Sequence, residues 1–473
     1  FHVELQGGRP QMAAGAGGNL RLGPGLACSE AASGTTQVTL LGDALDPLDC
    51  ARSNADIATA LAAAHSFEGF ESAAHALGGR WLAIVRIGPA ARVYLDACGS
   101  RPVYWVRLAA GDIALASQPG LLAAAHGIDR LPALDAEFRQ FRRFANSWPL
   151  ELTPYRGVQA LLPNHCLDLV DGTVHRVWPR AALQPVAEED AAAEIARLLR
   201  GTIDALRLRG SLALALTAGH DSRTLYAAAG APQSLRLFRI DGGHLPAYDR
   251  SVPHALVRRF GGSLIDVRPP PNTPALRAAL RAATGGIWSD PGAYMLPAFG
   301  ATGADYVLVG HHAEVARRFY DKSGSGARVH DAASLAAAAR FAPHPRVLAA
   351  FEAWQRALPA CGIDPLDLLY WEHRAGNWAA LLLTAADAFC RPIPPFNNRR
   401  LLSIALSAPR QARCQPYRLQ RRVCEILLPG STELPFNFSR RDAFKSRMLG
   451  MLPWRLQRRL DRAAAAEAAT LWD

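Results

Sequence analysis

The stretch Ser211–Ser222 constrains the fold of this chain more than any other, because it joins a strand pattern directly to a helix start. It opens with the short apolar run Leu212–Leu216, which is typical of a buried parallel strand. The small and polar residues Thr217–Ser222 then form a tight turn, and the alanine-rich segment Leu225–Ala229 predicts a helix after it. A strand, a turn and a helix in this order indicate an α/β unit built on a parallel sheet.

The same turn has the properties of a site for a polyphosphate. The backbone N–H groups and the positive end of the helix dipole point towards this position, and the small side chains of Ala218 and Gly219 let an anion approach. Asp221 is itself negative, so its place beside a phosphate makes chemical sense if a Mg²⁺ ion lies between them. The alternative is an ordinary strand-to-helix turn in which Asp221 and Ser222 act as caps.

The second half of the chain alternates between strand and helix patterns, which predicts a parallel sheet with helices on both faces. Ligands bind such sheets at the carboxyl ends of the strands. Two turns fall there, Thr217–Ser222 and Gly310–Glu314. The predicted strands are Leu212–Leu216, Leu235–Ile240, Ser263–Val267 and Tyr306–Val309, with helices at Ala187–Leu208, Arg223–Ala229, Asp249–Phe260 and Thr273–Thr284. From Ala333 the pattern is mainly helical, with segments at Ala333–Arg340, Pro345–Leu358, Pro365–Ala388, Asn398–Ala408, Tyr417–Leu428 and Leu452–Ala469.

The first half of the chain shows a different sequence pattern. Strand patterns at Trp81–Ile87, Ala91–Asp96, Val103–Val106 and Ile113–Ser117 are joined by tight turns rich in glycine and proline, which predicts an antiparallel β-rich layer. The proline-bearing stretch Arg176–Pro185 separates the β-rich pattern from the alternating strand and helix pattern, and is the best domain boundary.

Composition narrows the class of protein. The 473 residues carry a net charge of +11, but the cations are spread along the chain, no nucleic-acid motif is visible, and lysine occurs only at Lys322 and Lys445. No apolar run reaches the length of a membrane span, and the start shows no basic segment followed by an apolar one. The eight cysteines are scattered, without a CxxC pair or a zinc-like spacing. We therefore expect a reduced, cytoplasmic protein that binds neither membranes nor nucleic acid.

Several motifs occur in the order found in the asparagine synthetase family, and the chain resembles that family from about Phe67 to Lys445. Those in the first half are Leu77–Leu82, Tyr94–Tyr104, Thr153–Val158 and Leu161–His165. In the second half, Thr217–Ser222 is similar to the family's Ser-Gly-Gly-x-Asp-Ser pyrophosphate loop, with Thr and Ala replacing Ser and Gly. The other similar positions are Asp249 followed by Ala255, Arg374, Asp387–Arg391 and Pro395–Asn398.

The resemblance implies two domains and one chemistry. Residues 1–180 would form an α+β, glutaminase-like (class II glutamine amidotransferase-like) β-sandwich domain. Residues 181–473 would form an α/β ATP-pyrophosphatase domain with a parallel sheet and a helical C-terminal part. Members of this family use ATP and Mg²⁺ to adenylate a carboxylate, release pyrophosphate and form an amide with a nitrogen nucleophile. Such chemistry needs a cation for the leaving pyrophosphate and a base for the amine.

Site residues follow from the same resemblance. Asp221 and Glu314 match the metal positions, although the family usually has Asp at the second one. His311 stands where amide-forming relatives carry Glu or Tyr and matches a base for the attacking amine, and Lys445 falls near the family's late catalytic lysine, where Arg440 or Arg441 align equally well. The implied ATP and pyrophosphate residues are Leu216, Thr217, Ala218, Gly219, His220, Asp221, Ser222, Phe238 (at the adenine-lining position) and Gly310.

Each of these residues also has a simpler interpretation. His311 and His312 are alternatively loop histidines with ordinary hydrogen bonds, Lys445 part of a solvated basic tail, and Glu314 a surface helix cap. The neighbouring pair Arg317–Arg318 is either a solvated helix face or a binding site for phosphate or carboxylate.

One departure from the family concerns the first domain. A working glutaminase needs an N-terminal cysteine nucleophile whose own amine is the base. Residue 1 here is Phe1, and the first cysteine is Cys28. We therefore expect a degenerate glutaminase domain with a scaffolding or substrate-binding role.

This departure points to relatives whose amine belongs to the substrate itself. These are lasso-peptide cyclases, which close a macrolactam on a precursor peptide, and β-lactam or carbapenam synthetases. The expected function is thus an ATP-dependent carbon–nitrogen ligase in natural product biosynthesis, with a peptide substrate slightly favoured over a small molecule. A cyclase would also bring in a partner protease and a leader-binding protein. The alternative from another class is a non-catalytic binding protein on a degenerate synthetase fold.

Overall fold

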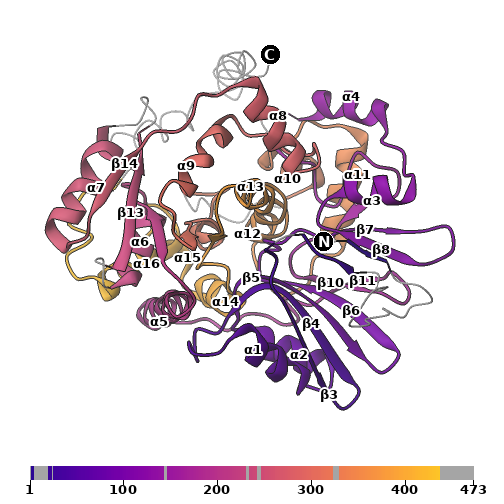
Figure 1. The fold of residues 1–473 in the computed structure, drawn as a ribbon, viewed down its shortest axis with the longest axis horizontal. Helices are drawn as coiled ribbons and strands as arrows, with labels where there is room; N and C mark the ends of the chain where they lie inside the picture. Colours follow the sequence, from indigo (N-terminus) through magenta and orange to yellow (C-terminus); the bar gives the residue numbers. More distant parts are fainter. Residues whose placement is uncertain are drawn as a thin grey trace.

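The computed structural model describes residues 2–4, 20–23, 25–142, 146–230, 234–241, 247–322 and 330–436. The chain is a mixed α/β protein, in which two antiparallel sheets precede a separate parallel sheet and a set of C-terminal helices (Figure 1). Across the described ranges, every helix is either too short or too polar to cross a membrane.

The two antiparallel sheets lie in the first half of the chain, as its strand patterns predict. One sheet has six strands in the order β11-β10-β6-β5-β4-β3 and the other has five in the order β2-β1-β8-β7-β9. The strands of the first are β3 (Cys28–Ser33), β4 (Thr36–Leu45), β5 (Gly78–Ile87), β6 (Ala90–Leu95), β10 (His165–Asp168) and β11 (Val174–Arg176). Those of the second are β1 (His2–Glu4), β2 (Leu20–Arg21), β7 (Tyr104–Arg107), β8 (Ile113–Ala116) and β9 (Gln159–Ala160).

Strand β5 shows why these elements form layers. Successive side chains of a strand point to opposite faces of the sheet. Trp81 and Ala83 pack into a cluster with helices α1 (Asn54–Ala62) and α2 (Phe67–Ala74), whereas Leu82 and Ile84 pack into a second cluster with residues of β7, β8 and their connections. Both faces of the six-stranded sheet are therefore covered, one by helices and the other by the second sheet. On the second sheet, α3 (Pro119–His126) contacts β7 and β8, and α4 (Pro132–Phe141) follows it in the chain.

The parallel sheet has five strands in the order β14-β13-β12-β15-β16, and every pair is parallel. The predicted strands are confirmed as β12 (Leu212–Ala215), β13 (Leu235–Ile240), β14 (Leu264–Val267) and β15 (Tyr306–Leu308). Strand β16 (Pro392–Ile393) was not predicted, because two residues carry no periodicity and only the pairing with β15 defines the strand.

Helices surround this sheet and continue beyond it. They are α5 (Glu188–Arg207), α6 (His220–Ala229), α7 (Ala247–Phe260), α8 (Pro274–Ala283), α9 (Pro297–Gly300), α10 (Ala332–Ala338), α11 (Pro345–Arg356), α12 (Pro365–Leu369), α13 (Ala380–Ala386), α14 (Arg399–Ser407), α15 (Arg410–Arg413) and α16 (Arg418–Leu427), with the short 3₁₀ segments η2 (Pro291–Met295) and η3 (Ala313–Arg317). The helix predicted over Pro365–Ala388 is instead α12 and α13 joined by a π-helix, η4 (Tyr370–Ala379). The helix predicted over Leu452–Ala469 lies outside the described residues.

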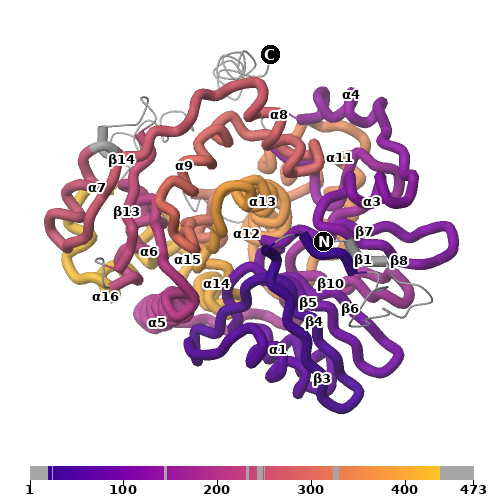
Figure 2. Tube along the Cα trace, in the orientation of Figure 1, coloured from indigo at the N-terminus to yellow at the C-terminus, as the bar shows by residue number. Residues whose placement is uncertain are grey.

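Helices α12, α13 and α14 lie between the antiparallel and parallel sheets, as Figure 2 shows for the orange part of the chain. Here the fully buried Arg80 of β5 donates to both carboxylate oxygens of Asp387, at 2.6 and 3.1 Å, and to the carbonyl oxygen of Pro392 at 3.2 Å. Asn397 donates to the carbonyl oxygen of Gly79 at 2.6 Å. The motifs Asp387–Arg391 and Pro395–Asn398 therefore join the two halves of the chain.

Candidate functional site

The turn Thr217–Ser222 leads from the middle strand of the parallel sheet, β12, into α6. Gly219 is the residue before the helix, with φ −68° and ψ 160°, and the helix begins at His220. Strand β12 lies in the middle of the sheet. The next two strands in the chain, β13 and β14, lie on one side of it, and β15 and β16 lie on the other side. The turn thus lies at the point where the strand order reverses, which is the usual ligand position in open parallel sheets.

The N–H groups of the turn donate to oxygen atoms of the protein. Thr217 N donates to Ser222 Oγ at 3.1 Å, Gly219 N to Thr217 Oγ1 at 3.0 Å, and Ala218 N to a carboxylate oxygen of Asp249 at 2.8 Å. The two hydroxyls of Thr217 and Ser222 lie 2.8 Å apart. A negatively charged oxygen, that of Asp249, already accepts one N–H of this turn. A nucleotide phosphate at this turn would have to take the place of these protein oxygens, that of Asp249 among them.

Asp221 lies in the first turn of α6 and is held by two donors. One carboxylate oxygen accepts from Arg317 Nη2 at 2.7 Å and the other from Gln420 Nε2 at 2.9 Å. Burial raises the pKa of Asp221 to about 6, against the opposing effect of the Arg317 guanidinium. The ionised form of Asp221 is therefore stabilised chiefly by the Arg317 guanidinium beside it.

Glu314, the second predicted metal residue, approaches the same cation. Its Oε1 lies 3.4 Å from Nη2 of Arg317, the atom that also contacts Asp221. Burial opposes the charge of Arg317, but the carboxylates of Asp221 and Glu314 outweigh it and raise the pKa of this guanidinium. Two carboxylates from different loops thus converge on one positive atom.

This convergence fits a single divalent cation with few protein ligands. Mg²⁺ is often held by one or two carboxylates together with waters and substrate phosphates. Asp221 and Glu314 supply two carboxylates, and within the described ranges no cluster of three or more His, Cys, Asp and Glu side chains is arranged to hold a metal. A metal at this position would displace the Arg317 guanidinium and take its remaining ligands from water and phosphate.

Gly310, at the end of β15, allows the two loops to approach. A Cβ atom added to Gly310 would lie 2.5 Å from the Cβ atom of Asp221, closer than side chains pack. The predicted role of Gly310 in the site is therefore one of close backbone approach, which only glycine permits.

The imidazole of His311 is buried beside the π-helix η4. The centroid of its ring lies 5.9 Å from the centroid of the Trp378 ring. The Arg374 guanidinium lies over the same Trp378 ring, 4.1 Å from its centroid. Burial lowers the pKa of His311, and Arg374 adds to this, while Glu314 and Asp290 oppose it. The ring is therefore neutral at pH 7, which is the form that accepts a proton.

His312 has a different role from its neighbour. Its Nε2 lies 2.9 Å from Oγ of Ser100 in the first half of the chain, and its backbone has φ 76°, an uncommon value for a residue with a side chain. The same Ser100 hydroxyl accepts from Asn397 Nδ2 at 3.0 Å. His312 thus has one side-chain hydrogen bond, through Nε2, while its buried Nδ1 has no partner among the described residues, and the simpler interpretation stays a prediction.

The remaining predicted residues are placed as follows. Leu216 is buried and donates its N–H to the carbonyl oxygen of Phe238 at 2.9 Å. Phe238 is fully buried, with its ring against Phe299 and its backbone within the sheet, so its predicted contact with an adenine ring stays a prediction. The ring of His220 stacks on Phe436 at 4.1 Å. Lys445 lies outside the described residues.

The arginine pair after η3 is not solvated. Arg317 contacts Asp221 and Glu314, as described above, and its guanidinium lies 5.2 Å over the ring of Tyr417. Arg318 is 2% exposed and forms ion pairs with three carboxylates. The interpretation of this pair as a solvated helix face is wrong, because both guanidinium groups pair with carboxylates of the protein, and binding of a phosphate or carboxylate ligand stays a prediction.

The sequence analysis did not identify Gln420 or Arg223 as part of this site. Gln420 comes from α16, far from Asp221 in the chain. Arg223, one turn into α6, donates to the carbonyl oxygens of Leu434 and Pro435 at 2.8 and 2.7 Å. Neither residue lies in a recognisable motif, so only their positions in space connect them with the turn.

We compared the chain with known proteins. A scan against models of protein families found no match, and a search of curated proteins found none either.

Proposed function

We propose that this chain is an ATP-dependent, AMP-forming amide ligase that adenylates a substrate carboxylate and couples it to an amine without hydrolysing glutamine. The observation that carries the proposal is the approach of Asp221 and Glu314 to one nitrogen of Arg317. These carboxylates follow neighbouring parallel strands, β12 and β15, at the carboxyl edge of the sheet. Both carboxylates are partly buried, with side chains 21% and 27% exposed, and one or two carboxylates together with substrate phosphates are the usual ligands of Mg²⁺.

The residues divide the chemistry between them. The N–H groups of Thr217, Ala218 and Gly219 would bind the pyrophosphate part of ATP, with Ser222 in support. Asp221 and Glu314 would hold Mg²⁺, which when bound neutralises charge on the leaving pyrophosphate. Arg317 would stay beside the phosphates as a second positive charge once it leaves the carboxylates.

His311 is the proposed base of the second step. An amine attacks the acyl carbon of the adenylate, the bond from carbon to the AMP oxygen breaks, and AMP leaves with its electron pair. The amine nitrogen loses a proton in this step, and a neutral imidazole accepts it. The lowered pKa of His311 supports this role, because the ring is unprotonated at pH 7.

The finer domain assignment belongs to the same proposal. Residues 1–180 would be a degenerate glutaminase-like sandwich, supported by two antiparallel sheets packed face to face with helices outside them. Residues 181–473 would be the ATP-pyrophosphatase domain, supported by the parallel sheet order. The substrate we favour is a precursor peptide that is closed to a macrolactam, with a small-molecule amide or β-lactam as the alternative; a leader-binding protein and a protease would be partners of the peptide reaction.

The test is release of pyrophosphate and AMP from Mg·ATP by the full chain, measured with a panel of peptides and small carboxylates. Asp221→Asn is expected to abolish release. Asp190→Asn, at an exposed aspartate in the first turn of α5, is the matched control and is expected to behave as the wild type. Equal release by the wild type and Asp221→Asn would exclude the proposed role of the carboxylate.

A second candidate function is a nucleotide-binding protein without catalysis. It is favoured by one observation: Arg317 already neutralises both carboxylates, and Asp249 already accepts the N–H of Ala218. Isothermal titration with ATP separates the two functions. Binding that is equal with and without Mg²⁺, together with no pyrophosphate release for any carboxylate, would favour the binding protein over the ligase.

A further inference from the structure

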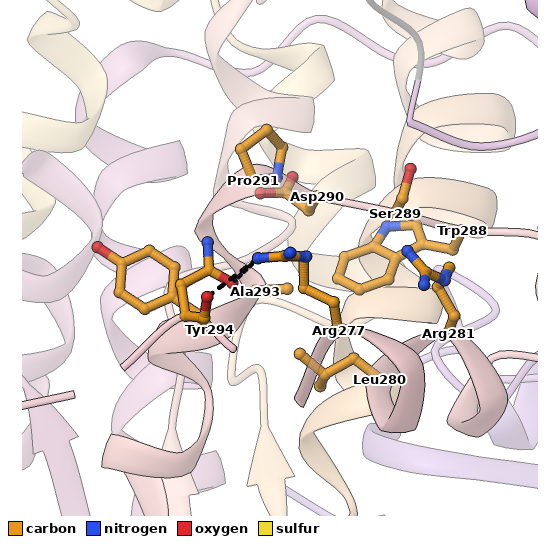
Figure 3. A pocket seen from close by; sticks show the side chains of 10 residues that line it. Arg277, Leu280, Arg281, Trp288, Ser289, Asp290, Pro291, Ala293 and Tyr294 are labelled. Atoms are coloured by element: carbon orange, nitrogen blue, oxygen red, sulfur yellow. Dashed lines mark hydrogen bonds between the residues drawn. The ribbon is translucent and has the colours of Figure 1, made fainter. Parts of the chain in front are cut away.

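A cavity of about 50 Å³ that opens to solvent lies between α8 and η2 (Figure 3). Figure 3 shows the Arg277 side chain in the middle of the lining, with Tyr294 on one side and Trp288 and Arg281 on the other. None of these residues entered the site derived above. Its lining combines cationic, aromatic and apolar side chains, namely Arg277, Leu280, Arg281, Trp288, Asp290 and Tyr294.

The indole of Trp288 indicates that the cavity receives a hydrogen-bond acceptor. This residue is 3% exposed, and its Nε1 is buried with no hydrogen-bond partner among the described residues. A buried N–H group without an acceptor destabilises a protein by about 1–3 kcal/mol. Trp288 lines the cavity, and its Nε1 lies beneath the surface, so an acceptor atom of a ligand that reached this nitrogen would remove the penalty.

The charges of the lining favour a negative acceptor. Arg277 Nη1 donates only to neutral oxygens, the carbonyl and Oδ1 of Asn272, at 3.0 and 3.2 Å. Neither Arg277 nor Arg281 forms an ion pair with any residue that the structure describes. Arg277 is partly exposed and Arg281 is exposed, and neither guanidinium group has a counter-charge among the described residues.

The one carboxylate in the described lining does not supply that counter-charge. Asp290 Oδ2 accepts from Asn146 Nδ2 at 2.8 Å and from Trp378 Nε1 at 3.0 Å, and Oδ1 accepts from the N–H of Gly292 at 2.8 Å. Both oxygens of Asp290 thus already accept hydrogen bonds from residues that do not line the cavity. An anionic ligand would meet the two arginines and the Trp288 N–H without competition.

The rest of the wall is apolar. Leu280 is 4% exposed and Ala293 is 6% exposed, and the rings of Trp288 and Tyr294 lie beside them. Binding sites for small molecules typically combine such walls with a few polar groups that fix the ligand's orientation. The lining therefore suits a carboxylate that carries an apolar chain.

The wall of this cavity also touches the candidate site. Trp378, which donates to Asp290, packs its ring against His311 at 5.9 Å between centroids. A ligand in the cavity is thus separated from the proposed base by Asp290 and Trp378. This places the cavity next to the reacting groups.

We propose that the cavity between α8 and η2 is a substrate subsite that binds a carboxylate bearing an apolar chain, through Trp288 Nε1, Arg277 and Arg281. The assignment of the ligand as substrate rests on the proposed ligase function, whereas the binding itself does not. An apolar residue at the carboxyl end of a peptide has this chemistry.

Binding is tested without ATP, on the full chain with ¹⁵N-labelled indoles and sodium hexanoate as the probe. One indole N–H resonance, missing in Trp288→Phe, is expected to move during the titration. Hydrogen bonds to charged groups contribute about 1.5–3 kcal/mol, so Trp288→Phe and Arg281→Gln are each expected to weaken hexanoate binding about tenfold or more. Arg356→Gln, at an exposed arginine of α11, is the matched control and is expected to bind as the wild type.

The neutral probe hexanamide separates a carboxylate from a peptide carbonyl. Weaker binding of hexanamide than of hexanoate, with no further loss in Arg281→Gln, supports the proposal. Equal binding of the two probes, no movement of the Trp288 resonance, or an equal loss in Arg356→Gln overturns it. Because ATP is absent, hexanoate binding that survives in Asp221→Asn keeps this result independent of the proposed ligase activity.

Discussion

The Ser100 hydroxyl lies 2.9 Å from Nε2 of His312, and this contact joins the antiparallel half of the chain to the loop that carries His311 and Glu314. The same Ser100 hydroxyl accepts from Asn397 Nδ2 at 3.0 Å. Burial holds the pKa of His312 well below its usual range, in agreement with a neutral ring. The first half of the chain thus contacts the loop that carries the predicted base, His311, through Ser100.

The first prediction removes this contact. Ser100→Ala removes the partner of His312 Nε2 and one of the two acceptors of Asn397 Nδ2, and is expected to lower the free energy of unfolding in urea by about 1–3 kcal/mol. In the proposed reaction it is expected to slow amide formation more than pyrophosphate release, since the turn Thr217–Ser222 is untouched. Ser72→Ala, at an exposed serine bonded to the Glu68 carbonyl oxygen, is the control and should change stability by less than about 0.5 kcal/mol. Equal losses in the two variants would contradict a positioning role.

The second prediction concerns pH. Asp221 has a pKa of about 6 in the folded chain, above the value of about 3.9 for an unfolded aspartate. Between these values the folded chain binds more protons than the unfolded chain, so the contribution of Asp221 to stability falls as pH rises from about 4 to 6. Relative to Asp221→Asn, the wild type is expected to lose up to about 3 kcal/mol over this window, measured by urea unfolding at each pH. A pH-independent difference would show that the carboxyl is not perturbed.

The third prediction tests Arg317 as the group that occupies the cation position. Arg317→Gln leaves Asp221 and Glu314 without their shared counter-charge, so the variant is expected to be less stable without metal. Addition of Mn²⁺ is expected to raise its melting temperature more than that of the wild type, because the ion no longer has to displace a guanidinium. Arg356→Gln serves again as the control. If Mn²⁺ stabilised all three proteins equally, the two carboxylates would not form a metal site.

The fourth prediction concerns the contact between Arg80 and Asp387. The arginine is fully buried and its partner binds it through both oxygens. The Asp387 side chain is 37% exposed, so the loss is that of a charge-assisted hydrogen bond, about 1.5–3 kcal/mol, and Asp387→Asn is expected to fall near the lower end because the amide oxygen still accepts one bond. Glu189→Gln breaks the exposed pair with Arg422 and should change stability by less than about 1 kcal/mol. Chemical unfolding of both variants measures the difference.

The fifth prediction tests His311 as a base. His311→Ala is expected to slow amide formation about 10²-fold, the usual lower range for loss of a general base, while pyrophosphate release continues. Burial lowers the pKa of His311, so in the wild type the amide-forming step should keep its rate at pH values below the ordinary histidine pKa of about 6.5. His175→Ala, in β11, is the control. Loss of both steps together in His311→Ala would indicate a structural role.

The sequence determined the elements whose signals are local. The alternation along β5 set its two faces, and the apolar run of β12 followed by a small-residue turn set the strand, turn and helix order around Asp221. These patterns predict structure because strand and helix periodicities depend on neighbouring residues alone. They also gave Asp221 and Glu314 as carboxylates at the same edge of one sheet, which the geometry confirms.

Only the tertiary structure decided which distant side chains meet. The spacing of residues in the sequence does not predict the contacts of Asp221 with Gln420, Ser100 with His312, or Arg80 with Asp387. Sequence periodicity likewise predicts neither the π-helix η4 nor the two-residue strand β16. These contacts arise because buried polar groups must be paired inside a close-packed interior, and the partner is whichever side chain the packing of other elements brings near. The sequence therefore predicted the two carboxylates of the candidate site, Asp221 and Glu314. The position of Arg317 between them, the contact of Ser100 with the loop and the cavity between α8 and η2 followed only from the fold.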